Sequence, residues 1–235
     1  MITKPIAWSH TALEHAEQCL RSYHAVRVTK EFPQTQGEQL IWGNRVHAAF
    51  ECALRDNAPM PEGMELWQAT VEQFRRLKGT LLVEQELAIT EGFQPCEWFA
   101  KDAWCRGVID ALWVDGAVAK AVDWKTGKRK PNSDQLALFA LLVFHHYPQV
   151  EEVRTMFVWL KSLEVDKETF GRMHIPELWQ RFIPKLRRLK NAFDTDTWPA
   201  KTSGLCANFC PVLTCPFNGR QHLNRGSTSG PVGKK

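Results

Sequence analysis

Apolar and polar positions follow two different periods along this chain, a helical one near its start and end and a strand-like one in its middle. The segments that we expect to form helices are about 9–26, 38–55, 62–78, 133–147 and 176–193. The segments rich in β-forming residues, which we expect to form strands, are about 80–90, 95–100, 104–114, 117–124 and 153–161. Gly79 follows the third helix and suits a left-handed helix end. Helices therefore come first and an antiparallel sheet follows, which predicts an α+β protein.

The strands over 104–114 and 117–124 are separated by Asp115-Gly116, a strong signal for a tight hairpin turn. If these two residues form the loop, Val114 faces Ala117 and Asp110 faces Ala121. Asp123 then lies diagonal to Asp110, at roughly 7–8 Å. The turn therefore predicts a register that brings two acids close together.

Side chains alternate between the two faces of a strand, so Asp123 and Lys125 share the face that carries Asp110. One interpretation is that these are exposed polar residues on the wet side of a sheet. The apolar neighbours Ile109 and Val122 instead indicate a half-buried sheet, where two like charges are unfavourable unless a cation or the lysine compensates them. This favours a site that can hold a divalent metal and activate water.

Composition sets outer limits on the class of protein. The chain has 235 residues with 44% hydrophobic and 24% charged content, typical of one substantial core with a small appendage. The longest apolar run, 136–144, is too short to cross a membrane, and no signal-peptide pattern precedes it, so we expect a cytoplasmic protein. The net charge of +4 permits a nucleic-acid partner without arguing strongly for one. We find no glycine-rich phosphate loop, helicase motif or Ser-His-Asp arrangement, so we expect no nucleotide cofactor.

Two helical residues could join the hairpin acids. Gly43, His47 and Glu51 are spaced four apart and share one face of the second helix, where the glycine allows close approach. His47 is either a metal ligand or an ordinary histidine at the edge of the core. Gln135 begins the helix after the hairpin, where it either closes a capping box with Asn132 or faces phosphate.

Four motifs in order resemble the RecB-type exonuclease branch of the PD-(D/E)XK nuclease superfamily. They are Gly43-x-x-x-His47, Gly107-Val-Ile-Asp110, Val122-Asp123-Trp-Lys125-Thr-Gly and Gln135-Leu-Ala-Leu-Phe139. The resemblance covers roughly residues 9–215. It implies a restriction-endonuclease-like core, with a central mixed β-sheet flanked by helices. The chain departs from the family at Phe139, where tyrosine is common, and the lost hydroxyl bears on substrate placement.

The resemblance also implies a role for each motif residue. His47, Asp110 and Asp123 would hold Mg²⁺ or Mn²⁺, with the main-chain carbonyl of Trp124 as a further ligand. Lys125 would orient the attacking water, and Gln135 would complete the catalytic set.

These roles imply a metal-dependent deoxyribonuclease, with an exonuclease in recombination, repair or phage DNA metabolism as the leading hypothesis. Its partner would be DNA, as single strands or duplex ends, and a helicase or recombination protein could work with it. A structure-specific or restriction-type endonuclease and a non-catalytic DNA-binding module remain the alternatives. The intact acids and lysine argue against the non-catalytic module.

A second group of residues lies near the C-terminus, where Cys206, Cys210 and Cys215 fall within ten residues. Thiols so close, with proline after two of them, are typical of a metal-binding knuckle that needs a fourth ligand. The chain resembles the AddB-type and CRISPR-associated iron–sulfur nucleases, in which an N-terminal cysteine, here Cys19, completes a 4Fe-4S cluster. The cysteine intervals of three and four residues differ from the more usual two and five, and zinc or unliganded thiols remain alternatives. The three other cysteines are expected to be buried hydrophobic residues: Cys52, Cys96 and Cys105.

We expect one nuclease domain over 1–219, followed by a disordered tail at 220–235. Its parts are N-terminal helices at 9–78, a catalytic core at 80–195 and a Cys-rich segment at 200–219 that packs with the N-terminal helix to form a helical subdomain.

Three weaker signals surround the core motifs. Glu84 and Glu86 lie on one face of the strand before the hairpin, and one of them could approach the metal. Two basic runs, at 125–130 and 185–190, could follow a DNA backbone or simply form solvated faces.

Overall fold

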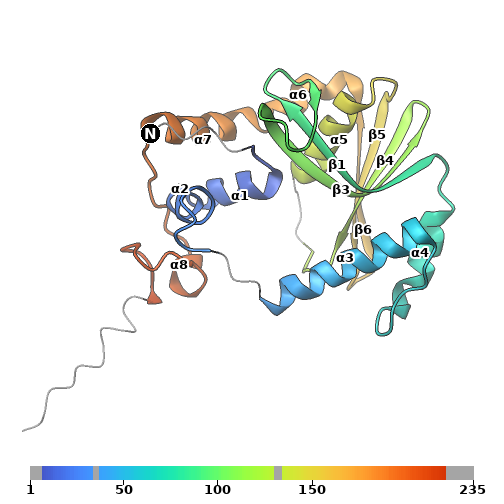
Figure 1. Cartoon of the computed structure of the whole chain (residues 1–235), viewed down its shortest axis with the longest axis horizontal. Coiled ribbons are helices and arrows are strands. Elements are labelled where there is room, and N and C mark those ends of the chain that lie inside the picture. The colour runs from blue at the N-terminus through green and yellow to red at the C-terminus, as the bar shows by residue number, and fades with distance from the viewer. Residues whose placement is uncertain (1–6, 34–36, 130–133, 221–235) are drawn as a thin grey trace, which may run out of the picture. The chain divides into compact units, whose positions relative to one another are not determined.

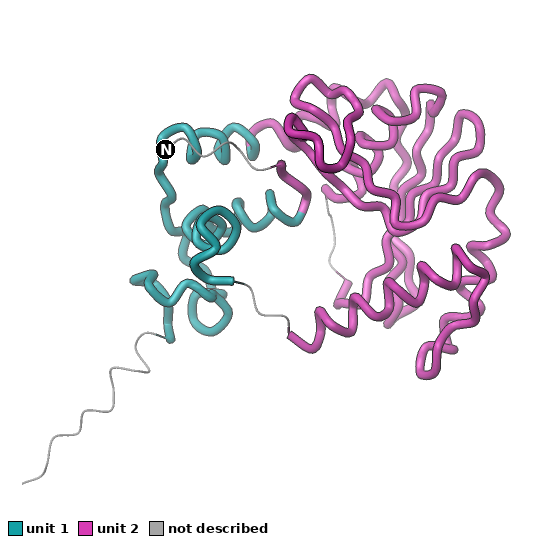
Figure 2. Tube along the Cα trace, viewed as in Figure 1, with its two compact units in different colours: residues 1–6, 11–35, 185–235 teal, residues 7–10, 36–184 magenta. Residues whose placement is uncertain are grey.

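The computed structural model describes residues 7–33, 37–129 and 134–220 (Figure 1). It divides the chain into two compact units (Figure 2). The larger unit contains residues 7–10 and 36–184, and the smaller contains 1–6, 11–35 and 185–235. The tail expected from residue 220 lies outside the described residues from 221 onward.

The larger unit is built on a six-stranded sheet with the order β2-β1-β3-β4-β5-β6. The strands are β1 (Thr80–Thr90), β2 (Pro95–Cys96), β3 (Ala103–Asp115), β4 (Val118–Lys125), β5 (Glu152–Trp159) and β6 (Glu164–Gly171). Neighbouring strands are antiparallel except β4 and β5, which run parallel and are connected through helix α5 (Asp134–His146). A parallel pair needs such a crossover. The sheet is therefore mixed, and the expected mixed sheet with flanking helices is confirmed.

Helices cover both faces of this sheet (Figure 1). Trp124 of β4 stacks on Phe50 of α3 (Glu38–Asp56), with ring centroids 4.4 Å apart. The preceding residue, Asp123, instead accepts a hydrogen bond from Gln135 of α5. Because neighbouring strand residues point to opposite faces, α3 and α5 lie on opposite sides of β4. All nine residues of α5 from Leu136 to Phe144 are buried, which explains the continuous apolar run in the sequence.

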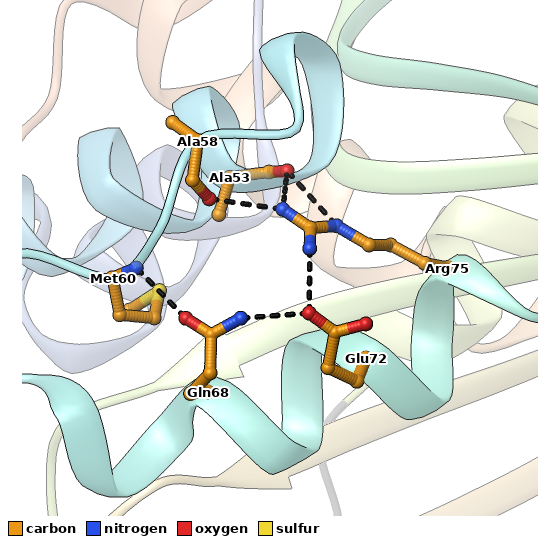
Figure 3. Close-up of polar contacts among 6 residues, drawn as sticks. All are labelled: Ala53, Ala58, Met60, Gln68, Glu72 and Arg75. Atoms are coloured by element: carbon orange, nitrogen blue, oxygen red, sulfur yellow. Dashed lines mark hydrogen bonds and ion pairs between the residues drawn. The ribbon is translucent and has the colours of Figure 1, made fainter.

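The C-terminal end of α3 is anchored by Arg75 of α4 (Gln68–Arg75), as Figure 3 shows. Its Nη2 atom donates to the main-chain carbonyls of Ala53 at 2.6 Å and Ala58 at 2.9 Å, while Nη1 contacts Glu72. Carbonyls in the last turn of a helix, such as that of Ala53, lack partners within the helix, so the guanidinium supplies the missing bond and links it to Ala58 beyond the helix end. This contact fixes the helix that carries His47.

Several expected boundaries are wrong. The helix expected at 9–26 is interrupted at Cys19, whose backbone is extended with φ −167° and ψ 112°. It forms α1 (His10–Gln18), α2 (Leu20–Tyr23) and a π-helical turn, η1 (His24–Val28). The strand expected at 95–100 is only the short β2. The helix expected at 62–78 is a 3₁₀ turn, η2 (Glu65–Trp67), followed by α4, which ends four residues before the left-handed Gly79.

The late helix is also divided, and two elements were not expected. A short 3₁₀ turn, η3 (Arg172–His174), precedes α6 (Ile175–Gln180), and α7 (Ile183–Thr195) follows. The unexpected elements are β6 and α8 (Leu205–Asn208). Most of β6 is at least partly exposed because it forms the sheet edge, so it lacks the apolar alternation by which a strand is recognised. No helix among the described residues is long and apolar enough to cross a membrane.

Candidate active site

The site forms where β3 and β4 separate. Their ladder runs from Asp115 opposite Val118 to Ala111 opposite Val122 and then ends, although both strands continue. Beyond that point β3 remains paired with β1, and β4 with β5. The opened edge of β3 pairs instead with Trp8, whose N–H donates to the Trp104 carbonyl at 2.9 Å. Such a divergence leaves room for side chains from both faces.

The predicted hairpin register is wrong by two residues. The loop is Gly116-Ala117 rather than Asp115-Gly116, and Gly116 has a φ of +56°. A two-residue turn with glycine first needs a positive φ at the glycine only. A turn over Asp115-Gly116 would have required a positive φ at Asp115 as well. Continuing the ladder by one residue puts Asp110 opposite Asp123 instead of diagonal to it. A shift of two residues preserves the alternation of faces within the regular ladder, which extends only to Ala111 and Val122.

The Asp110 carboxylate contacts residues on two different elements, strand β4 and helix α3. Its Oδ2 atom accepts the main-chain N–H of Trp124 at 2.7 Å, and its Oδ1 atom lies 3.2 Å from Nδ1 of His47 on α3. The side chain is buried, with 7% of its surface exposed. The helical histidine and the strand acid therefore meet directly. The main-chain N–H of Trp124 therefore binds Asp110. The role of the Trp124 carbonyl as a metal ligand stays a prediction.

Asp123, Lys125 and Gln135 form a closed set of contacts. Gln135 Nε2 donates to Asp123 Oδ1 at 2.8 Å, and Lys125 Nζ donates to Gln135 Oε1 at 2.9 Å. Lys125 Nζ also lies 2.7 Å from Asp123 Oδ2. That buried oxygen has no hydrogen bond of acceptable angle among the described residues, so its contact with the lysine is an ion pair. Gln135 thus holds both charged groups, and the proposed capping partner Asn132 lies outside the described residues.

The charges of the site perturb one another. Burial raises the pKa of Asp123 to about 6, and the Asp110 charge adds to this effect while Lys125 and His47 oppose it. Burial and Asp110 raise the pKa of Glu84 to about 7. Burial alone would lower the pKa of His47, but its hydrogen bond to Asp110 and the surrounding acids outweigh burial and raise it. Burial is the largest cause for the two acids and the charge of Asp110 adds to it, so a cation nearby would favour their ionised forms.

The donor atoms present fit a divalent cation. Among the described residues, one set of histidine, cysteine or acid side chains places three donor atoms within 4.8 Å of one another: His47, Glu84 and Asp110. Carboxylate oxygens with one imidazole suit hard or borderline ions such as Mg²⁺ and Mn²⁺. Asp123 lies outside this set, although its buried Oδ2 can still accept a cation. Of the two glutamates on β1, Glu86 is exposed, and only Glu84 belongs to the set.

A cavity of about 420 Å³ opens beside these donor atoms on the α3 side. Its lining includes Gly43, His47, Glu84 and Thr126. A Cβ atom added at Gly43 would lie 3.4 Å from Thr126 Oγ1, tighter than most such contacts. The close approach expected at Gly43 is therefore an approach to the loop that follows Lys125.

In the smaller unit, the four candidate cluster cysteines line one cavity of about 600 Å³: Cys19, Cys206, Cys210 and Cys215. All four are free thiols. Main-chain N–H groups of Lys201 and Ser203 donate to the sulfurs of Cys19 and Cys206, each at 3.4 Å. Among the described residues, no three cysteine sulfurs lie within 4.8 Å of one another, the spacing that a single zinc ion would require. The expected burial of the remaining cysteines holds for Cys105 only, since Cys96 is partly buried and Cys52 is exposed at the solvent side of α3.

The two basic runs are partly engaged in ion pairs. Arg129 contacts Asp166 and Glu164 of β6. In the second run, Arg188 contacts Glu17 and Lys190 Nζ lies 2.7 Å from Asp194. Lys130 lies outside the described residues. Contact of either run with DNA therefore stays a prediction.

Comparisons with known proteins identify a family from the sequence and a similar fold among solved structures. The model of the PD-(D/E)XK nuclease superfamily matches residues 7–216. Among solved structures, a protein described as a candidate exonuclease from Eubacterium rectale is similar, with a TM-score of 0.54 at 11% identity over 86% of each chain. The structure of SSO0001 matches with a TM-score of 0.49 at 14% identity over 93% of this chain and 90% of that one. The comparison with curated proteins gave no match.

Proposed function

Because this chain belongs to the PD-(D/E)XK nuclease superfamily, we propose that it is a Mg²⁺- or Mn²⁺-dependent exonuclease that hydrolyses phosphodiester bonds in DNA. The observation that carries the proposal is the meeting of Asp110, Asp123 and Lys125 where β3 and β4 separate. Lys125 lies 2.7 Å from Asp123 there, and Asp110 is fixed by the Trp124 N–H. Two buried acids beside a lysine supply both cation ligands and positive charge for the transition state.

Each residue has a distinct task in this mechanism. His47, Asp110 and Asp123 would hold the cation, with the Trp124 carbonyl as a further ligand. When bound, the cation lowers the pKa of a water molecule and draws charge from the scissile phosphate. Lys125 orients the attacking water and offsets the negative charge that develops on the phosphate oxygens. Gln135 keeps Lys125 and Asp123 in position through its two hydrogen bonds.

An end-dependent reaction separates the exonuclease from an endonuclease on the same fold. The test offers linear and covalently closed circular DNA of the same sequence to the protein with Mg²⁺. Degradation of the linear form alone supports the exonuclease, whereas nicking of the circle supports the structure-specific or restriction-type endonuclease. Loss of neither form would contradict both and favour a DNA-binding module.

For the smaller unit we propose a 4Fe-4S cluster held by Cys19, Cys206, Cys210 and Cys215. The shared cavity and the N–H groups directed at two of the sulfurs support this, because such hydrogen bonds are typical of iron–sulfur ligands. Four thiolates at the corners of a cluster are farther apart than the ligands of a single zinc ion. Iron and sulfide analysis after anaerobic purification tests the proposal. A colourless protein without iron would overturn it, and one equivalent of zinc would support the alternative.

We further propose that residues 1–219 act as one cytoplasmic nuclease domain in which the segment 200–219 packs with the N-terminal helices. A cluster of Ala25, Val212 and Cys215 in the smaller unit supports this arrangement. DNA would be its partner, with a helicase or recombination protein as an associated factor. Co-purification of such a protein with the tagged chain checks that part of the proposal.

A further inference from the structure

Phe99 lies in the turn that connects β2 to β3, and 84% of its surface is exposed. Two hydrogen bonds hold this turn: the N–H of Ala100 donates to the Glu97 carbonyl at 3.0 Å, and the N–H of Ala103 donates to the Ala100 carbonyl at 3.1 Å. A ring that stays in water contributes little to the stability of the fold. A fixed turn therefore presents an aromatic ring to solvent without need of it in the core.

The guanidinium of Arg106 on β3 lies beside this ring. Its central carbon is 6.0 Å from the ring centroid of Phe99 and 5.5 Å from that of Trp98. Among the residues that the structure describes, no acid forms an ion pair with this guanidinium, and its buried Nε atom has no hydrogen-bond acceptor. A guanidinium stacked on aromatic rings is a group that binds phosphate well. The positive charge of Arg106 thus has no direct partner in the described part of the protein.

Arg106 and Asp110 lie on the same face of β3. A Cβ added at Gly107 would lie 2.6 Å from Leu142, so Gly107 faces α5. Because side chains alternate along a strand, Arg106 and Asp110 both point away from α5. Asp110 accordingly meets His47 of α3 on that side. The stacked arginine and the acid of the candidate active site therefore share one surface of the sheet.

The surface between Arg106 and Asp110 is open and short. Val108 lies between them and is partly exposed, and Glu86, its partner on β1, is exposed. Four residues of strand span roughly 13 Å. This length matches about four nucleotides at the ~3.4 Å spacing of a stacked strand, and fewer in an extended one. A DNA strand with a phosphate at Asp110 can therefore reach Phe99 and Arg106 a few nucleotides away.

We propose that Phe99 and Arg106 form a subsite for an unpaired nucleotide, so that the substrate is DNA with a single-stranded end. The base stacks on Phe99, and Arg106 binds the neighbouring phosphate. Bases inside a duplex are stacked on one another, so only an unpaired base offers its face to the ring. The proposal rests on the proposed function and names the substrate of the same site.

A protein partner is the alternative explanation for an exposed aromatic ring. The core of a protein interface is depleted in charged residues and forms a contiguous apolar patch. Around Phe99 the exposed residues of the turn are instead charged: Glu97, Lys101 and Asp102. One ring among charges, next to a guanidinium without an ion pair, fits a nucleotide better than an apolar partner surface.

The test is the fluorescence anisotropy of a labelled single strand of about 12 nucleotides, titrated with the full-length protein in EDTA to prevent metal-dependent hydrolysis. We expect Phe99→Ala to weaken binding about tenfold and Phe99→Trp to retain it, because a larger ring also stacks. Arg106→Met should weaken binding and reduce its salt dependence by the equivalent of about one phosphate contact.

Met173→Ala is the matched control. Met173 is also 84% exposed, but it follows β6 at the opposite edge of the sheet from β2. This variant should bind the single strand as the wild type does. Circular dichroism confirms that each variant is folded.

The outcomes separate the subsite from the proposed function. Equal affinity of wild type and folded Phe99→Ala for the single strand would overturn the subsite and leave the ring to a protein partner. An equal loss on a blunt duplex, or a wild type that binds only the duplex, would overturn it too. Hydrolysis of linear DNA with Mg²⁺ is measured separately. A protein that binds the single strand through Phe99 but degrades no DNA would contradict the nuclease and not the subsite.

Discussion

The replacement of Glu84 by glutamine should stabilise the metal-free protein, and only above a defined pH. The pKa of this carboxyl rises from 4.5 to about 7 on folding, mainly because of burial and then because of Asp110. The folded state therefore binds the Glu84 proton more tightly than the unfolded state. Stability from this group is complete below pH 4.5, declines as the pH rises toward 7, and stays low above it.

The size of the effect follows from the same change in pKa. A rise from 4.5 to about 7 corresponds to at most ~3 kcal/mol of lost stability above pH 7. Glu84 is only partly buried, so solvent screening reduces this to ~1–2 kcal/mol. Glutamine cannot ionise, so the variant should avoid the loss. For a chain of this size the midpoint of thermal unfolding should rise by roughly 2–8 °C at pH 8.

The assay is thermal unfolding with EDTA at pH 4.5 and pH 8, with Glu86→Gln as the control. We expect wild type and Glu84→Gln to unfold at similar temperatures at pH 4.5, and the variant to be the more stable at pH 8. A difference that does not change with pH, or a variant less stable than wild type at pH 8 without metal, would refute the reasoning.

Three further substitutions test other parts of the structure. Asp123→Asn should lower the rate of DNA hydrolysis at least ~10²-fold with no loss of stability, since it removes a buried charge beside Asp110; near-normal turnover would exclude Asp123 from the site. Arg75→Met removes the hydrogen-bond donors to the carbonyls of Ala53 and Ala58 and should destabilise the protein by ~2–3 kcal/mol. Urea unfolding measures this loss, and an unchanged midpoint would show that water replaces the lost donors. Gly107→Ala places a Cβ 2.6 Å from a Leu142 methyl and should lower the free energy of unfolding by ~1–3 kcal/mol. Gly127→Ala, which has open space around it, should change the free energy of unfolding little. Equal effects of the two substitutions would contradict the packing of α5 against β3.

Local patterns in the sequence predicted much of the architecture. The helix at 38–55 and the strand at 80–90 match α3 and β1 closely, because each presents one continuous apolar stripe or run. The hairpin and the helix that follows it were also expected. The edge strand β6 was not, since its pairing with β5 depends on main-chain bonds that any side chains allow. It follows β5 directly, across residues 160–163, and occupies the free edge of that strand.

The sequence alone determined that Asp110, Asp123 and Lys125 lie on the two strands of one hairpin, because the turn signal at Gly116 is local. It did not determine the register, because either residue pair beside Gly116 satisfies the local signal. Only the tertiary structure decided that β3 and β4 separate beyond Ala111, that Gln135 links Lys125 to Asp123, and that Glu84 faces His47. These features depend on the left-handed backbone of Glu84 inside β1 and on helices that approach from opposite faces. No local pattern of residues encodes such contacts.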